Sequence, residues 1–334
     1  MSRLGACRSS LLVLAVWWQW IYTTWATNWI HPESGAGRAL MFSLMFLALL
    51  GSSSIPDAFG DRAPTFAFAH CATQVGRSRY VARLMRSWDD QHALNFQRIT
   101  VWLACASPFW ALGAYCGYTS RQSQSTKEEA HSSQLFLWVV ALGVEYAGPV
   151  VGFWLPFGLG KTRAAEWDVI GGHVAERCAL FVIICLGETI LVTGELYAEK
   201  ERPDFETHVA FLVAFVTSVT LWHAYFRFAH KKAAAHIELA ENPGAVARLV
   251  FTYVHIPIVA GIIFAAVAIR FVMDDPTATA TPRLASAQVA GPGLYLLGTA
   301  HAKFAISGGR VLFSPECEAK RMSPGNNFEP IKNI

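Results

Sequence analysis

Nine stretches of about twenty mostly apolar residues constrain the fold of this chain more than any other feature. A helix needs about twenty apolar residues to cross the hydrocarbon core of a bilayer. Only 15% of the 334 residues are charged and 53% are hydrophobic, whereas soluble domains carry about 25% charged residues. The sequence therefore predicts an all-α fold, a polytopic transmembrane helix bundle. Its helices are expected near residues 11–30, 39–55, 64–86, 97–118, 133–157, 171–195, 206–230, 246–273 and 288–306.

The loops between these helices are short and polar, and none could hold a separate folded domain. We expect one helical bundle over residues 1–306 and a polar C-terminal tail over 307–334 that is rich in Pro and Asn and disordered. Lys and Arg favour the side of the membrane that receives the segments after the first, third, fifth, seventh and ninth helices. Because cytoplasmic loops are enriched in Lys and Arg, the C-terminus is predicted to be cytoplasmic.

Composition and motifs exclude several classes of function. The net charge of +3 is small, and no basic run with interleaved aromatic residues suggests binding of nucleic acid. No phosphate-binding glycine loop or serine-hydrolase elbow is present. The 7 cysteines include no C-x-x-C pair, so neither a disulfide framework nor a zinc site is expected. We predict no metal and no cofactor.

The segment H-V-A-E-R-C-A-L-F-V-I-I-C-L-G-E-T-I, residues 173–190, carries ionisable side chains in strongly apolar sequence. On a helix, His173, Arg177 and Glu188 share one face, with Glu176 beside it. Placing an ionisable group inside a membrane costs free energy, so such groups face a protein interior or a wet cavity. The stripe is therefore expected to face the inside of the bundle.

Partners for this stripe must come from other predicted helices. The candidates, which complete our set of polar intramembrane residues, are Gln74, Arg77, Glu145, His223, Arg227 and His255. One interpretation is an internal polar path for an ion, a proton or a small solute; the other is a set of interhelical contacts that only hold the bundle together. A metal site is not favoured, because the spacing of His173 and Glu176 matches neither H-E-x-x-H nor E-x-x-H.

Several segments resemble the bacterial low temperature requirement protein A (LtrA) family. The similar segments are W-W-Q-W-I-Y-T-T-W-A-T-N-W at 17–29, I-P-D-A-F-G-D-R at 55–62, Q-V-G-R at 74–77 and H-V-A-E-R…L-G-E at 173–188, with weaker matches at 148–156 and 253–262. Members of this family usually begin with a helix containing F-F-D-L-V-F, which is not found here, and continue as apolar sequence where this chain turns polar.

The resemblance implies a multi-pass protein of the bacterial plasma membrane with a role in adaptation to cold stress. Three functions stay open at this point. The first is a transporter-like or channel-like protein, with membrane lipids and an ion, proton or small solute as its partners. The second is a membrane-embedded enzyme on lipid or isoprenoid substrates, with Glu188 and His173 as acid and base, although the residues favour a non-enzymatic role. The third is a structural protein without transport.

Overall fold

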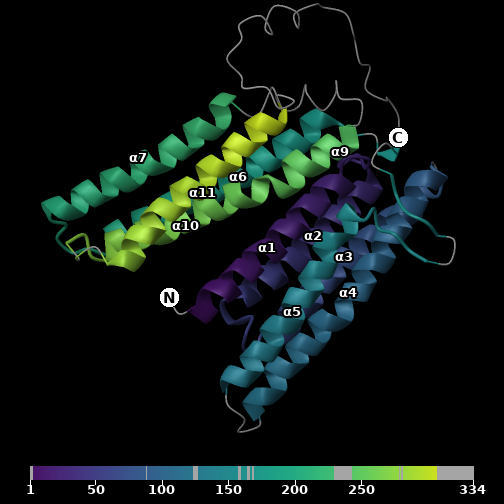
Figure 1. Cartoon of the computed structure of the whole chain (residues 1–334), viewed down its shortest axis with the longest axis horizontal. Helices are drawn as coiled ribbons and strands as arrows, with labels where there is room; N and C mark the ends of the chain where they lie inside the picture. The colour runs from purple at the N-terminus through teal and green to yellow at the C-terminus, as the bar shows by residue number, and fades with distance from the viewer. Residues whose placement is uncertain are drawn as a thin grey trace, which may run out of the picture. The chain divides into compact units, whose positions relative to one another are not determined.

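All nine predicted segments form helices of twenty residues or more in the described part of the chain (Figure 1). The structure is a computed structural model, and it describes residues 3–87, 89–122, 127–156, 159–163, 166–167, 169–228, 243–277, 279 and 281–306. The predicted tail over 307–334 lies outside these residues. Within them there is no β-strand, only an isolated bridge between Leu155 and Gly160. The predicted all-α class is confirmed.

The helices follow one another along the chain. Their bounds are α1 Arg3–Ala26, α2 Gly35–Ser54, α3 Ala63–Met85, α4 Asp90–Gln122, α5 Lys127–Val150, α6 Gly171–Ala198, α7 Phe205–Phe228, α9 Pro243–Ala247, α10 His255–Asp274 and α11 Pro282–Ile306. A short 3-10 helix, Ile55–Asp57, follows α2, and a π-helix, Arg248–Tyr253, precedes α10.

Six of the described helical segments are long and apolar enough to cross a membrane. They are Gly35–Asp57, Asp90–Thr119, Ser132–Val150, Gly171–Ala198, Phe205–Arg227 and Gly244–Asp274. The helices α1, α3 and α11 are less apolar. In α3 the reason is clear, because this helix buries polar side chains such as Gln74 and Arg77 against its neighbours. A helix surrounded by protein does not need an apolar surface on every side.

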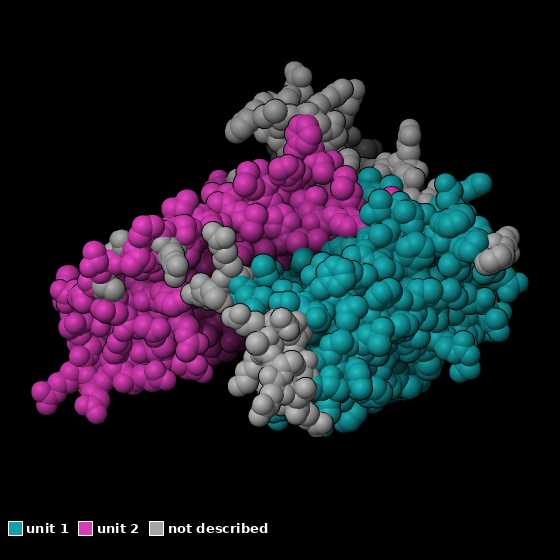
Figure 2. Space-filling model, turned by 60° about the horizontal axis from the view of Figure 1, so that its bottom comes forward, with its two compact units in different colours: residues 1–174, 237–247 teal, residues 175–236, 248–334 magenta. Residues whose placement is uncertain are grey.

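The described residues divide into two compact units, each with a core of its own (Figure 2). Unit 1 comprises residues 1–174 and 237–247, and unit 2 comprises residues 175–236 and 248–334. In unit 1, α3 packs against α1, α2 and α4, and α5 packs against α4 and α1. Its core is aromatic, with Phe66, Trp110 and Trp138 together and almost completely buried.

In unit 2, α10 and α11 lie closely side by side (Figure 1). Small residues allow this approach: a Cβ added to Gly261 would lie 2.5 Å from the backbone nitrogen of Tyr295, and one added to Gly291 would lie 2.6 Å from that of Ala265. Close contacts of small residues are typical of helix pairs in membranes. Side chains from α6, α7, α10 and α11 then fill one core cluster around Tyr225.

Large apolar side chains cover the outer faces of the candidate spans. In α2, for example, Phe42, Met45, Phe46 and Leu49 are each more than 60% exposed. A soluble protein rarely exposes such a continuous apolar surface. These faces are suited to contact with the hydrocarbon of a lipid bilayer.

The helix predicted to extend to residue 157 ends earlier, at Val150. The chain turns after Pro149 because Gly152 and Phe153 both adopt positive φ angles, of 67° and 50°. A Cβ at position 152 would lie only 2.6 Å from the carbonyl oxygen of Thr162, so a glycine fits this turn. The motif G-P-V-V-G-F-W-L-P therefore ends a helix instead of crossing the membrane.

The predicted helix over 246–273 is interrupted by the π-helix Arg248–Tyr253. Pro257 has no backbone N–H to donate to the carbonyl of Tyr253, so one hydrogen bond of the regular helical pattern is missing at this turn. The wider turn is recorded by a hydrogen bond of 3.1 Å from the nitrogen of Val254 to the oxygen of Leu249. It also leaves the carbonyl of Val250 within 2.8 Å of Nδ1 of His255.

Candidate functional site: a buried polar centre in unit 1

One face of α3 carries the polar residues on which the candidate site is built. His70, Gln74 and Arg77 are spaced by four and three residues, so they lie above one another on this helix. All three are buried, and the side chain of Arg77 is only 2% exposed. A charged guanidinium at this depth needs several hydrogen-bond partners.

The carboxylate of Glu145, from α5, faces this side of α3. Its two oxygens lie 3.1 and 3.2 Å from Nε2 of His70. Nε2 of Gln74 donates to Oε2 at 3.1 Å, and the indole Nε1 of Trp110, from α4, donates to Oε1 at 2.8 Å. Side chains from α3 and α4 thus supply three hydrogen bonds to one buried carboxylate of α5, which is 1% exposed.

Arg77 is bound on the opposite side of Gln74, against α1. Its Nη2 donates to Oε1 of Gln74. Its Nη1 donates to Oγ1 of Thr23 at 3.1 Å and to the backbone oxygen of Gln19 at 3.3 Å. The guanidinium carbon also lies 5.4 Å from the centre of the Tyr22 ring, within the range of a cation–π contact.

Gln19 closes the network into a ring. Its side-chain Nε2 lies 2.7 Å from Nδ1 of His70, while its backbone oxygen accepts from Arg77. Hydrogen bonds therefore run from Glu145 through His70, Gln19, Arg77 and Gln74 back to Glu145. We call these five residues, together with Trp110, the polar centre. Arg77 and Glu145 do not form an ion pair with each other in the described part of the chain, because Gln74 and His70 lie between them.

A row of polar side chains on α1 extends from the polar centre to the start of α6. Gln19, Thr23 and Thr27 recur every four residues, so they share one face of α1. The hydroxyl of Thr23 donates to the oxygen of Gln19 at 2.8 Å, and Oγ1 of Thr27 lies 3.1 Å from Nε2 of His173. All of these side chains are half-buried. His173, at the beginning of α6, therefore belongs to the same polar row as Arg77.

The other predicted site residues lie in unit 2, where they do not gather. Arg177 is half-buried, and Glu176, His223 and Arg227 are exposed. His255 is buried, with Nε2 2.9 Å from the hydroxyl of Tyr225.

Glu188 is exposed, contrary to the expectation that its stripe faces inward. The buried face of α6 in this unit is instead the apolar one, where Val182 and Leu186 join the core cluster. Burying that face removes more apolar surface from contact with solvent than burying the stripe would. The spacing places the stripe on one face of the helix, but it does not predict which side of α6 packs.

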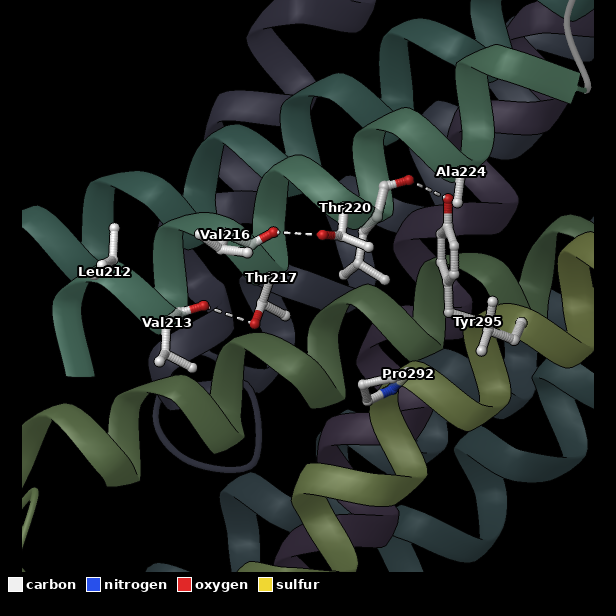
Figure 3. Close-up of a pocket in the computed structure, with 10 residues that line it drawn as sticks. Leu212, Val213, Val216, Thr217, Thr220, Ala224, Pro292 and Tyr295 are labelled. Atoms are coloured by element: carbon white, nitrogen blue, oxygen red, sulfur yellow. Dashed lines mark hydrogen bonds between the residues drawn. The ribbon is translucent and has the colours of Figure 1, made fainter. Parts of the chain in front are cut away.

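Unit 2 also carries an apolar groove of about 390 Å³ between α7 and α11 (Figure 3). Thr217 and Thr220 line it, but their hydroxyls donate to the carbonyls of Val213 and Val216 at 2.8 and 2.7 Å. The groove therefore offers almost no free polar group. It includes neither His173 nor Glu188, the two residues on which an enzymatic interpretation depends.

Sequence reasoning missed half of the polar centre. Gln74, Arg77 and Glu145 were predicted, whereas Gln19, His70 and Trp110 were not. His70 had a usable signal, because it lies one helical turn before Gln74. The spacing of Gln19 with Thr23 and Thr27 was a second signal. Trp110 gave none, because a tryptophan in an apolar helix is most simply a packing residue. Among the described residues, no group of three or more His, Cys, Asp or Glu side chains could hold a metal ion.

The candidate spans, the apolar outer faces and the buried polar centre define an integral, multi-pass membrane protein. The family described as bacterial low temperature requirement A protein (LtrA) matches residues 1–315. The chain belongs to this family. An uncharacterized protein of Rhizobium meliloti (strain 1021) is 38% identical over 295 residues, which cover 88% of this chain and 68% of the relative. No solved structure matches the chain.

Proposed function

We propose that this protein is transporter-like or channel-like and that an ion, a proton or a small solute interacts with its polar centre. The observation that carries the proposal is the burial of Arg77 and Glu145 without direct contact between them. Moving an ion out of water costs several kcal/mol even after relaxation of the protein. Ionisable groups that persist inside a membrane protein most often belong to a substrate or ion pathway.

The arrangement favours this proposal over a purely structural role. A direct, bidentate pair of Arg77 and Glu145 would bring the opposite charges into contact and recover the most Coulomb energy. Instead, each of the two groups is bound by other side chains: His70, Gln74 and Trp110 bind the carboxylate, and amide, hydroxyl and carbonyl groups bind the guanidinium. Such partners can exchange hydrogen bonds with a passing ligand without separating an Arg77–Glu145 pair.

The polar row of α1 supports a route to the polar centre. Thr23 and Thr27 place half-buried hydroxyls between Arg77 and His173. Each side chain in the row lies within hydrogen-bond distance of the next or of its backbone. A ligand that forms hydrogen bonds would therefore meet polar groups at every turn of this helix face.

We also propose that the protein lies in the bacterial plasma membrane with its C-terminus in the cytoplasm and with membrane lipids around it. The support is the Lys and Arg distribution, including Arg79, Arg83 and Arg86 at the end of α3. Fusions of a periplasmic reporter enzyme and of a fluorescent protein to the C-terminus test the orientation. An active periplasmic reporter with a dark fluorescent fusion contradicts it.

Flux through the purified protein in liposomes tests the function. Proton, potassium and small-solute fluxes are measured for the parent, for Glu145→Gln and for Glu206→Gln. Glu206 is an exposed carboxylate in the first turn of α7 and serves as the matched control. We expect flux in the parent and in Glu206→Gln, and a loss of at least about tenfold in Glu145→Gln, which corresponds to about 1.4 kcal/mol in the barrier.

Two outcomes contradict the proposal. One is no flux of any of the three kinds in the parent, with the protein shown to be folded by circular dichroism. The other is equal flux in Glu145→Gln and the parent. A Glu188→Gln variant is included because a loss confined to that variant would move the site from the polar centre to α6.

A further inference from the structure

We propose that the ligand of the polar centre is the proton. His70 binds it at Nδ1, while Nε2 on the other side of the imidazole stays hydrogen-bonded to Glu145. This inference rests on the proposed function for the use of the proton, but proton binding itself does not require transport. Its basis is the hydrogen-bond geometry of three residues from three helices: Gln19 of α1, His70 of α3 and Glu145 of α5.

The amide of Gln19 defines the protonation state of His70 from which we argue. Its nitrogen faces Nδ1 of His70 at 2.7 Å. In this orientation of the amide the nitrogen donates, so Nδ1 accepts and carries no hydrogen. The single ring hydrogen is then on Nε2, from which it is donated to Glu145. The geometry corresponds to a neutral imidazole beside a charged carboxylate.

One extra proton can be accepted with a small rearrangement. If a proton from water adds to the lone pair of Nδ1, that nitrogen becomes a donor, and Gln19 must turn its amide to present Oε1. The bond from Nε2 to Glu145 stays in place and becomes an ion pair. Release of the proton to water reverses both changes. Only one N–H bond forms or breaks, and every polar atom of the His70 ring keeps a partner in both states.

The charges around His70 make this binding reversible. From α5, Glu145 attracts the added positive charge directly. Arg77, from α3, repels the added positive charge. It lies on the far side of Gln19 and Gln74 from His70 and donates hydrogen bonds to both. With a neutral His70 the formal charge of the polar centre is zero, and with a protonated His70 it is +1, since Arg77 and Glu145 cancel.

The other titratable groups near the ring are neutral in their ordinary forms. They are Tyr22 of α1, Cys71 of α3 and Tyr146 of α5, while α4 contributes the indole of Trp110. No second acid among them competes with His70 for the proton. Access comes from α1, because Gln19 is half-buried and continues into the row of Thr23 and Thr27. The acceptor nitrogen thus faces the polar row of α1.

Trp110 provides a built-in reporter of this event. Its indole N–H donates to Glu145 at 2.8 Å, and the strength of that bond depends on whether the carboxylate also faces an imidazolium. The experiment records difference infrared and ultraviolet resonance Raman spectra of the purified full-length protein from about pH 5 to about pH 8, the range in which imidazole changes charge. Subtracting spectra of Trp110→Phe isolates one indole from the 12 tryptophans.

The expected result is a one-proton transition in the Trp110 signal, together with the imidazolium bands of a histidine. Both are lost in His70→Gln and kept in His31→Gln, which removes an exposed loop histidine. A Gln19→Glu variant offers a permanent acceptor to Nδ1–H and is expected to move the midpoint upward by at least about one pH unit, a tenfold gain in proton affinity. A group with only a structural role would not shift this midpoint.

A Trp110 signal that does not change with pH, or that changes equally in His70→Gln, overturns the inference. So does a Gln19→Glu variant that is folded and titrates like the parent. The two proposals fail separately: a His70 transition without any flux in liposomes retains the proton site and rejects transport. Flux without a His70 transition retains transport and rejects the proton as the ligand.

Discussion

Replacing Glu145 by Gln removes the negative charge of the polar centre with almost no change in side-chain shape. The carboxylate now accepts from His70, Gln74 and Trp110. A hydrogen bond to a charged group contributes about 1 kcal/mol more than one to a neutral group, so three weakened bonds amount to about 3 kcal/mol. Arg77 also remains as an uncompensated buried charge. We expect Glu145→Gln to lower the free energy of unfolding by about 3 to 4 kcal/mol, within the range for broken buried pairs.

The second arm of the experiment removes the positive charge with Arg77→Met. This change removes the donor to Oε1 of Gln74 and to Oγ1 of Thr23, while the oxygen of Gln19 still accepts from Thr23, and it is expected to cost about 2 kcal/mol. If the two charges compensate each other through Gln74, the double variant carries no net buried charge. It should then be more stable than the sum of the single effects by about 1 to 2 kcal/mol, a coupling typical of residues in one network.

The assay is reversible unfolding of the purified protein in mixed micelles, followed by far-ultraviolet circular dichroism. Glu206→Gln, an exposed change of the same chemistry, should leave the transition within about 0.5 kcal/mol of the parent. Additivity of the two single variants within about 0.5 kcal/mol would refute compensation, since uncoupled sites behave in that way. An increase in stability on Glu145→Gln would refute the premise that the carboxylate is satisfied by its three donors.

Two further predictions concern other parts of the fold. Gly261→Ala places a Cβ 2.5 Å from the backbone of Tyr295 and should lower stability by about 1 to 3 kcal/mol, whereas Gly293→Ala, where a Cβ meets nothing within 4 Å, should be neutral in the same unfolding assay. Asp89 accepts hydrogen bonds from the backbone and then the side chain of His92, which hold the pKa of its carboxyl below its usual range. The stabilisation by the charged carboxylate is present above the usual pKa of an Asp and is lost as the pH falls through the lowered pKa of Asp89. Near neutral pH, Asp89→Asn should therefore be less stable than the parent by under about 1 kcal/mol. At low pH the two proteins should be equally stable. A difference that persists at low pH would show that the charge of Asp89 is not its cause.

The helices could be predicted from the sequence because their signal is long and local. Twenty apolar residues in a row identify a span wherever its neighbours lie. The ends of helices were harder, since they depend on single residues. Gly152 follows the end of α5 with a positive φ, and Pro257, which lacks an N–H, follows the π-helix in the first turn of α10. Both residues are visible in the sequence, but the turn that each one makes depends on carbonyls of other residues.

The polar centre could be predicted only in part, because helical spacing gives the residues that share a face but not the direction of that face. In α3 the candidate partners Gln74 and Arg77 are buried. In α6 the stripe was expected to face inward, but Glu188 lies on the face opposite to Leu186, and Leu186 is the residue that packs. Which face packs is decided by the neighbouring helices. His70 and Gln19 were missed for a related reason: a neutral side chain in an apolar helix becomes informative only when its partner is known.

The polar centre and the polar row of α1 bring together side chains from segments that are far apart in the sequence. The tryptophan-rich segment at 17–29 supplies Gln19, Thr23 and Thr27, and the Q-V-G-R segment supplies Gln74 and Arg77. The H-x-x-E-R segment joins them through His173, which lies 3.1 Å from Thr27. Each of these residues is polar and forms a hydrogen bond with another member of the group or with its backbone. Such a continuous set costs stability in a hydrocarbon environment unless every member is satisfied. The ring around Glu145 meets this condition, because each of its side chains has a hydrogen-bond partner in the ring. The proton binding proposed at His70 would keep the bond from Nε2 to Glu145 in place.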